Sequence, residues 1–178
     1  MHQPPKSNRP GDDADKPITA AQMNRLNLEQ TASSGASWFY WIGALSLVNS
    51  IMTYTNSSFG FPIGLGVTQI VDAVASQSHN TTITIFAASF DAIAAGAMCA
   101  FGYFSKTIPW LFIPGMVLYA IDGLALGAFG AMTKSPDWIG VGFHAFALYC
   151  LFRGYQCSKD LAKIRKLEAL ERSARHLD

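Results

Sequence analysis

The chain has 178 residues, half of them hydrophobic, and its formal net charge is +1. Only six charged residues lie between Gln30 and Phe152, whereas a water-soluble domain carries roughly a quarter of its residues as charge. This deficit excludes an ordinary soluble domain and predicts an integral membrane protein. The sequence contains no zinc-ligand spacing, phosphate-binding loop, dinucleotide fingerprint or basic stripe for nucleic acid.

Residues 1–35 are predicted to form a polar, partly disordered N-terminal tail. Residues 1–17 hold four prolines and no apolar run, a composition that cannot bury enough surface to fold. Thr19 followed by Gln22 is the spacing of a capping box, which predicts a short amphipathic helix running to about Gln30. We expect this helix to lie on the membrane surface.

Four apolar segments are predicted to cross the bilayer, and together they form a transmembrane domain over residues 36–155. Each is long enough, or nearly so, to span a hydrocarbon core about 30 Å thick. Trp110–Met132 is the longest apolar run with a charge inside it, Asp122. The spans are expected at about 36–55, 83–104, 110–132 and 138–155.

Residues 62–75, between the first two spans, are too apolar for a loop and too short and polar for a comfortable crossing. We expect a re-entrant or interfacial helix, with a fifth crossing as the alternative. Lys and Arg gather at both ends of the chain, which predicts cytoplasmic termini and an even number of crossings. The expected location is the cell (plasma or inner) membrane.

Residues 156–178 are predicted to form a charged cytoplasmic helix that is either solvated or in contact with a partner. The predicted fold class is therefore all-α: a compact bundle of four transmembrane helices with one short helix between the first two spans.

Each apolar segment carries polar residues followed by small ones. Counting inward at 1.5 Å per residue places Asn49 about 9 Å, Asp91 about 12 Å, Asp122 about 15 Å and His144 about 9 Å deep, all in the outer half of the bilayer. A re-entrant segment that enters from the outer side would bring Gln69 and Asp72 toward the same layer. The candidate ligand- or ion-binding residues are Asn49, Gln69, Asp72, Asp91, Asp122 and His144.

Small residues lie beside two of these carboxylates. Ala92 and Gly96 follow Asp91, and Gly123 and Gly127 follow Asp122, at the spacing of close helix packing in membranes. They predict helix contacts next to each Asp, which would turn the carboxylates inward rather than toward lipid.

Two functions compete on this sequence. The polar layer could bind a proton, cation or small solute in a transporter or channel, because intramembrane carboxylates commonly mark such pathways. It could instead be structural, in an accessory or assembly subunit of a larger membrane complex. An intramembrane enzyme is the less favoured alternative, since no catalytic residue can be assigned. The expected partners are the lipid bilayer and a homo-oligomer or larger membrane complex. Nucleic acid and cofactors are not expected, and a metal ion is left open.

Overall fold

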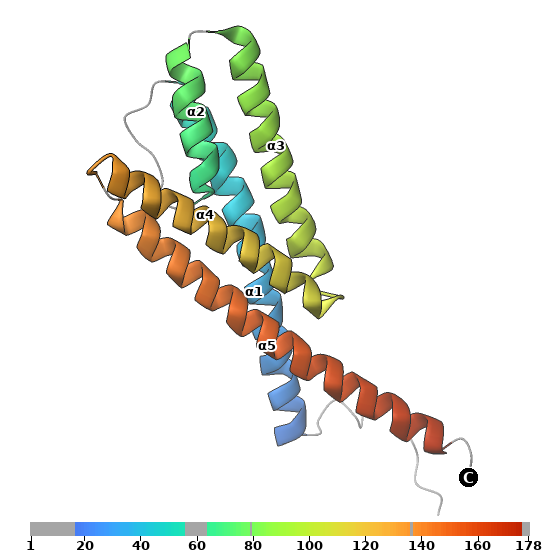
Figure 1. Ribbon diagram of the computed structural model, residues 1–178. Coiled ribbons are helices and arrows are strands. Elements are labelled where there is room, and N and C mark those ends of the chain that lie inside the picture. The colour runs from blue at the N-terminus through green and yellow to red at the C-terminus, as the bar shows by residue number, and fades with distance from the viewer. Residues whose placement is uncertain (1–16, 56–63, 79, 136, 176–178) are drawn as a thin grey trace, which may run out of the picture.

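Residues 17–55, 64–78, 80–135 and 137–175 are described by the structure, a computed structural model of the chain (Figure 1). The described residues form helices and no strands, which confirms the all-helical bundle. The elements in chain order are α1 (Ala20–Tyr54), α2 (Gly66–Ser78), α3 (Thr81–Phe104), the 3-10 turn η1 (Pro109–Leu111), α4 (Phe112–Met132) and α5 (Trp138–Arg175).

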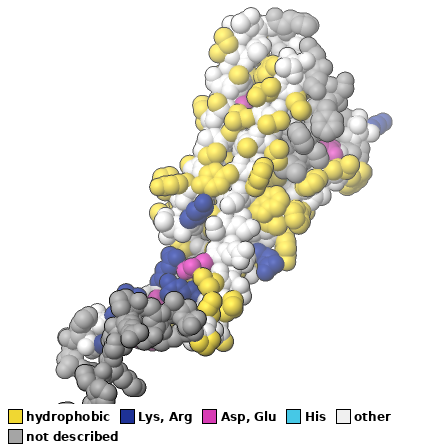
Figure 2. Space-filling view, turned by 180° about the vertical axis from the view of Figure 1, so that it is seen from behind, with side chains coloured by type: hydrophobic (Ala, Val, Ile, Leu, Met, Phe, Trp, Pro, Cys, Tyr) yellow, Lys and Arg dark blue, Asp and Glu magenta, His cyan; other side chains and the backbone are white. Residues whose placement is uncertain are grey.

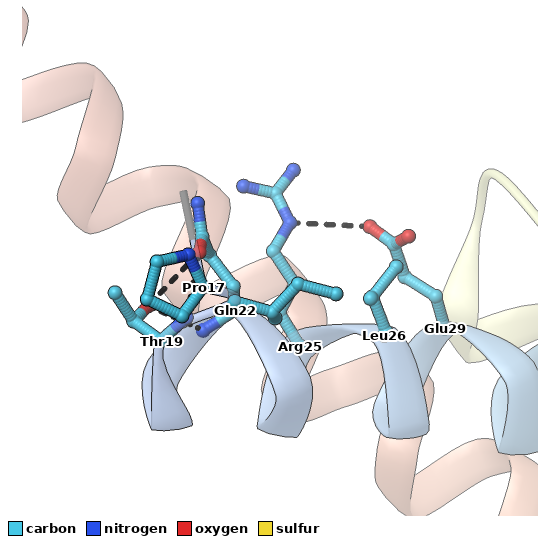
Figure 3. A pocket seen from close by; sticks show the side chains of 7 residues that line it. Pro17, Thr19, Gln22, Arg25, Leu26 and Glu29 are labelled. Carbon is cyan, nitrogen blue, oxygen red and sulfur yellow. Dashed lines mark hydrogen bonds and ion pairs between the residues drawn. The ribbon is translucent and has the colours of Figure 1, made fainter. Parts of the chain in front are cut away.

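The predicted capping box is confirmed at the start of α1 (Figure 3). The backbone N–H of Gln22 donates to the Thr19 hydroxyl (3.3 Å), and the Thr19 N–H donates to the Gln22 side-chain oxygen (2.9 Å). Two backbone donors that lack helical partners are thereby satisfied. One turn further on, Arg25 donates to Glu29 (3.2 Å) and to Glu168 of α5 (2.7 Å).

The structure differs from the prediction at both ends of the transmembrane domain. The predicted amphipathic helix and the first span form one helix, α1, of 35 residues, and the fourth span and the charged helix form α5, of 38 residues. Neither junction contains a proline or a left-handed residue that would stop a helix. The packing of α1 against α5 keeps both helices continuous beyond the ends predicted for the spans.

The bundle is organised by α1, which packs against α5 on one side and α3 on the other. Gly35 of α1 and Gly154 of α5 meet backbone to backbone: a Cβ on Gly35 would lie 2.4 Å from the Gly154 Cα. Gly43 fits in the same way against the Ala95 backbone of α3. The buried core beside these contacts includes Phe39. Figure 1 shows α4 and α5 side by side, with α2 and α3 paired at one end.

Much apolar surface remains uncovered. Among the described residues, two stretches are long and apolar enough to cross a membrane by length and composition, Thr81–Phe104 and Pro109–Met132. Large apolar side chains of α3 and α4 point outward, such as Phe86 (71 % exposed) and Leu124 (74 % exposed). Figure 2 shows hydrophobic side chains over much of one face, with most of the Lys and Arg side chains toward one end.

Candidate functional site

The short helix α2 begins inside the bundle, beside α1. Gly64 precedes it with a φ of 141°, which side chains other than glycine rarely adopt. The Leu65 N–H donates to the Ser46 hydroxyl of α1 (2.7 Å). A Cβ at Gly64 would lie 3.1 Å from the Asn49 side-chain amide, which places buried Asn49 against this turn. The chain therefore enters α2 through a backbone held by α1.

Asp122 of α4 caps the first turn of α2. Its two carboxylate oxygens accept the backbone N–H of Gly66 (2.7 Å) and that of Val67 (2.8 Å). These are first-turn N–H groups, which lack partners within their own helix and carry the positive end of its dipole. A negative carboxylate at this position supplies both the missing acceptors and the favourable charge. Asp122 is 5 % exposed, so water does not compete.

His144 of α5 completes this contact. Its Nε2 lies 2.9 Å from an Asp122 oxygen and its Nδ1 lies 2.8 Å from the Gly140 carbonyl. A carbonyl only accepts, so Nδ1 carries a hydrogen, and a second hydrogen lies between Nε2 and the carboxylate. The Tyr119 ring stacks on the imidazole at 4.5 Å, and Gly123 lies against it, where a Cβ would come within 2.9 Å of the His144 Cδ2. We call Asp122, His144 and the first turn of α2 the clamp.

A second pair of carboxyl groups lies elsewhere in the polar layer, and its bonding differs. Asp72 of α2 and Asp91 of α3 are buried close to each other, with Ser50 of α1 beside Asp91. The Tyr54 hydroxyl donates to one Asp72 oxygen (2.6 Å). The other Asp72 oxygen and both Asp91 oxygens are buried and accept no hydrogen bond from a described N–H or hydroxyl group. We call Asp72 and Asp91 the acid pair.

The structure thus divides the predicted layer into two groups. Asp122 is hydrogen-bonded to His144, whereas Asp91 lies beside Asp72. Gln69 is half-buried on α2 and makes no hydrogen bond to other described residues. Asp72 is six residues from Gly66, so α2 connects the two groups over a rise of about 9 Å. The described residues contain no group of three or more His, Cys, Asp or Glu side chains that could hold a metal ion.

The small residues that were predicted to pack beside Asp91 and Asp122 are placed differently on α3 and α4. Gly123 lies in the contact between α4 and α5, and Gly127 touches Val141 there with an ordinary spacing of 3.8 Å for an added Cβ. Ala92 and Gly96 lie on the outer side of α3, and an added Cβ at Gly96 would meet no atom within 4 Å. In this chain α3 packs through the face that carries the acid itself, with Ala87, Asp91, Ala95 and Met98.

Sequence reasoning missed Tyr54 as a partner of Asp72, and it missed the α2 backbone as a partner of Asp122. The helix start was marked by Gly64 and Gly66, because paired glycines before a helical run allow a tight turn and close backbone approach. The pairing of Tyr54 with Asp72 had no local signal, since α1 and α2 could be rotated in many ways about their axes.

Comparisons with protein-family models, with curated proteins and with solved structures find no match to this chain. The chemistry of the two groups therefore carries the functional assignment. The clamp joins three helices through satisfied hydrogen bonds, and the acid pair holds three buried oxygens without partners.

Proposed function

We propose that the protein is a multi-pass integral membrane protein with four spans, cytoplasmic termini and α2 as a short helix on the outer side. The apolar lengths of α3 and α4 support this proposal. Outward-facing side chains extend the apolar zone onto α1 and α5, as at Trp41 (61 % exposed) and Ile139 (65 % exposed). An exposed apolar surface of this extent is typical of contact with lipid. The placement corresponds to a plasma or inner membrane.

Within that membrane, the acid pair is proposed to bind and release a proton or a small cation, as part of a carrier or channel. The observation that carries the proposal is Asp91, which is 1 % exposed and whose carboxylate oxygens accept no hydrogen bond from the described part of the chain. A buried polar group without a partner is costly, and natural proteins keep such groups mainly where they serve a function. In the clamp, the Asp122 carboxylate and both ring nitrogens of His144 have hydrogen-bond partners, so the clamp is assigned a structural role.

The chemistry of the acid pair favours a proton over a divalent metal. Two neighbouring buried carboxyl groups cannot both be charged at low cost, so they share a proton when no cation is present. The Tyr54 hydroxyl holds one Asp72 oxygen, and the Ser50 hydroxyl lies beside Asp91. This set is small for Ca²⁺, which takes six to eight oxygen ligands.

The test is proton uptake by the purified protein in lipid nanodiscs, followed by infrared difference spectroscopy over a pH titration. We expect a protonated carboxyl band that disappears in Asp91→Asn and shifts in Asp72→Asn. Proteoliposomes loaded with a pH-sensitive dye then report whether an imposed membrane potential drives proton entry, and whether Asp91→Asn abolishes it. Folded wild-type protein that shows neither a titrating carboxyl band nor proton or cation movement would contradict the proposal.

A second candidate function is that of a subunit in a homo-oligomer or a larger membrane complex. The outer side of α3 favours it, because four small residues at a spacing of four form an exposed ridge: Ala88, Ala92, Gly96 and Ala100. Such ridges let membrane helices approach closely. Gly96→Leu should reduce the mass of the detergent-solubilised assembly if the ridge is a contact, while Ile93→Leu on the same helix should not.

A further inference from the structure

A cavity of about 290 Å³ lies at the end of the bundle away from α2, between three segments. Residues from α1, from the turn between α3 and α4, and from α5 line it. Those that matter here are Glu29, Ser33, Lys106, Pro109, Ser158 and Arg165. Its volume is at the small end for ligand sites, which suits a compact polar group better than an extended molecule.

The two cations of this cavity have no acidic partner among the described residues. Neither Lys106 nor Arg165 forms an ion pair there. The Lys106 ammonium lies 5.2 Å from the centre of the Tyr40 ring, which positions it without neutralising it. The acid on the cavity wall, Glu29, is bound by Arg25, which also binds Glu168. The carboxylates nearby are thus occupied, and the cavity is left with two free positive charges.

Arg25 remains charged throughout the pH range in which proteins fold. Its hydrogen bond with Glu29 and the charge of Glu168 raise its pKa above the ordinary value of an arginine. Arg25 therefore stays charged and paired with Glu29, and Glu29 does not neutralise the cavity cations. The hydroxyl of Ser158, a residue only 6 % exposed, also donates to no described acceptor. It adds a neutral hydrogen-bond donor to the two cations.

The cavity lies beside the ends of α3 and α4, where the cytoplasmic edge of the bilayer is expected. Lys106 follows the apolar helix α3 and precedes the apolar stretch that starts at Pro109. Tyr103 and Trp110 flank it and are 67 % and 61 % exposed, as is typical of aromatic side chains at a membrane interface. This placement rests on the proposed membrane orientation, in which the turn between α3 and α4 is cytoplasmic.

We infer that this cavity binds the phosphate group of an anionic phospholipid in the cytoplasmic leaflet. A phosphate offers negatively charged oxygens to a guanidinium and an ammonium at once. The lipid tails would lie against the outer surfaces of α3 and α4. Binding would join α1, α5 and the α3–α4 turn, and would set the depth of the bundle in the membrane.

The experiment uses the full chain in nanodiscs of phosphatidylcholine with and without phosphatidylglycerol. Spin-labelled lipids of each kind report the relative affinity for the protein. We expect a preference for phosphatidylglycerol that falls about ten-fold in Lys106→Gln and in Arg165→Gln, because each variant loses a charge-assisted hydrogen bond to the bound phosphate. The double variant should show no preference.

The matched control is Lys166→Gln, which removes one charge from the next position of α5 but does not line the cavity. It should leave the preference within about two-fold, because an exposed charge that does not contact the phosphate is largely screened by salt. An equal loss in Lys166→Gln would show diffuse surface attraction and overturn the inference. The thermal unfolding temperature of each variant establishes that it is folded.

Two further measurements distinguish a lipid phosphate from a soluble phosphate ester, and the proposed lipid site from the proposed proton site. Binding of glycerol 3-phosphate that depends on Lys106 and Arg165, without any lipid preference, would assign the cavity to a soluble phosphate ester and overturn the lipid. Asp91→Asn should keep the lipid preference, since the proposed orientation places the acid pair in the outer half of the bilayer and the cavity at its cytoplasmic edge. If this variant loses proton uptake and keeps the lipid preference, the result bears on the proposed proton binding and not on the cavity. A protein that does not insert into bilayers would overturn both.

Discussion

The clamp and the acid pair are both built on buried Asp residues and are connected by α2, and yet they have opposite bonding. In the clamp, the Asp122 carboxylate accepts two backbone N–H groups and faces an imidazole at 2.9 Å. In the acid pair, Asp91 is equally buried and its oxygens have no partner. The residue type and the burial are the same, so only the neighbours differ.

This difference separates a structural from a functional role for a buried carboxylate. A satisfied carboxylate is part of the packing, and its removal leaves other buried groups without partners. An unsatisfied carboxylate is costly to bury, and it is available for a proton or an ion. The comparison predicts that substitution of Asp122 will destabilise the fold strongly, whereas substitution of Asp91 will change its stability little.

The largest effect is expected for Asp122→Ala. The substitution leaves two backbone N–H groups and one imidazole without their buried acceptor, so the free energy of unfolding should fall by about 3–5 kcal/mol. Thermal unfolding in detergent, followed by circular dichroism, measures the change. The control is Asp160→Asn, an exposed carboxylate on α5 that should change stability little. Equal unfolding temperatures for Asp122→Ala and the wild type would contradict the structural role of the clamp.

The next effect is expected where Gly123 touches the imidazole. In Gly123→Ala the new methyl group would lie 2.9 Å from the His144 Cδ2, and overpacking of this kind costs about 1–3 kcal/mol. Gly96→Ala is the matched variant, because its methyl group meets nothing within 4 Å and its helix propensity improves by about 1 kcal/mol. Both variants gain the same helix propensity, so Gly123→Ala should be less stable than Gly96→Ala by about 1–3 kcal/mol. Equal stabilities of the two variants would show that the ring is not tightly packed.

A smaller effect is expected for Tyr54→Phe, which removes the hydrogen bond that the Tyr54 hydroxyl donates to the acid pair. The bond from the Tyr54 hydroxyl to Asp72 is 2.6 Å long, and its loss should lower the free energy of unfolding by about 1 kcal/mol. Tyr149→Phe, an exposed tyrosine on α5, serves as control. If Tyr54→Phe unfolds like the wild type, the hydroxyl does not hold Asp72 in the folded protein.

The smallest effect on stability is expected for Asp91→Asn. Asp91 accepts no hydrogen bond from a described residue, and the asparagine amide can donate to Asp72 in place of the shared proton, so the change should stay within about 1 kcal/mol. The unfolding temperature should therefore match the wild type while proton uptake disappears. A loss of stability as large as that of Asp122→Ala would remove the distinction between the two groups.

Part of this architecture could be predicted from local features. The apolar lengths of 83–104 and 110–132 predict the long helices α3 and α4, and Thr19 with Gln22 predicts the start of α1, since capping and hydropathy act over one or a few turns. The continuity of α1 and α5 was not predicted, because charge and composition change along each helix without a breaker. Tertiary contact at Gly35 stabilises the helical conformation through the polar stretch.

The sequence by itself determined that this is a helical protein with long apolar segments that carry buried polar residues. Those properties depend on composition and on the fixed rise of a helix. Only the tertiary structure decided which carboxylate meets the α2 backbone and which is left without partners. Asp122 and Gly66 are 56 residues apart, and their contact depends on how three helices are rotated and shifted against one another. That arrangement is set by packing across the whole bundle.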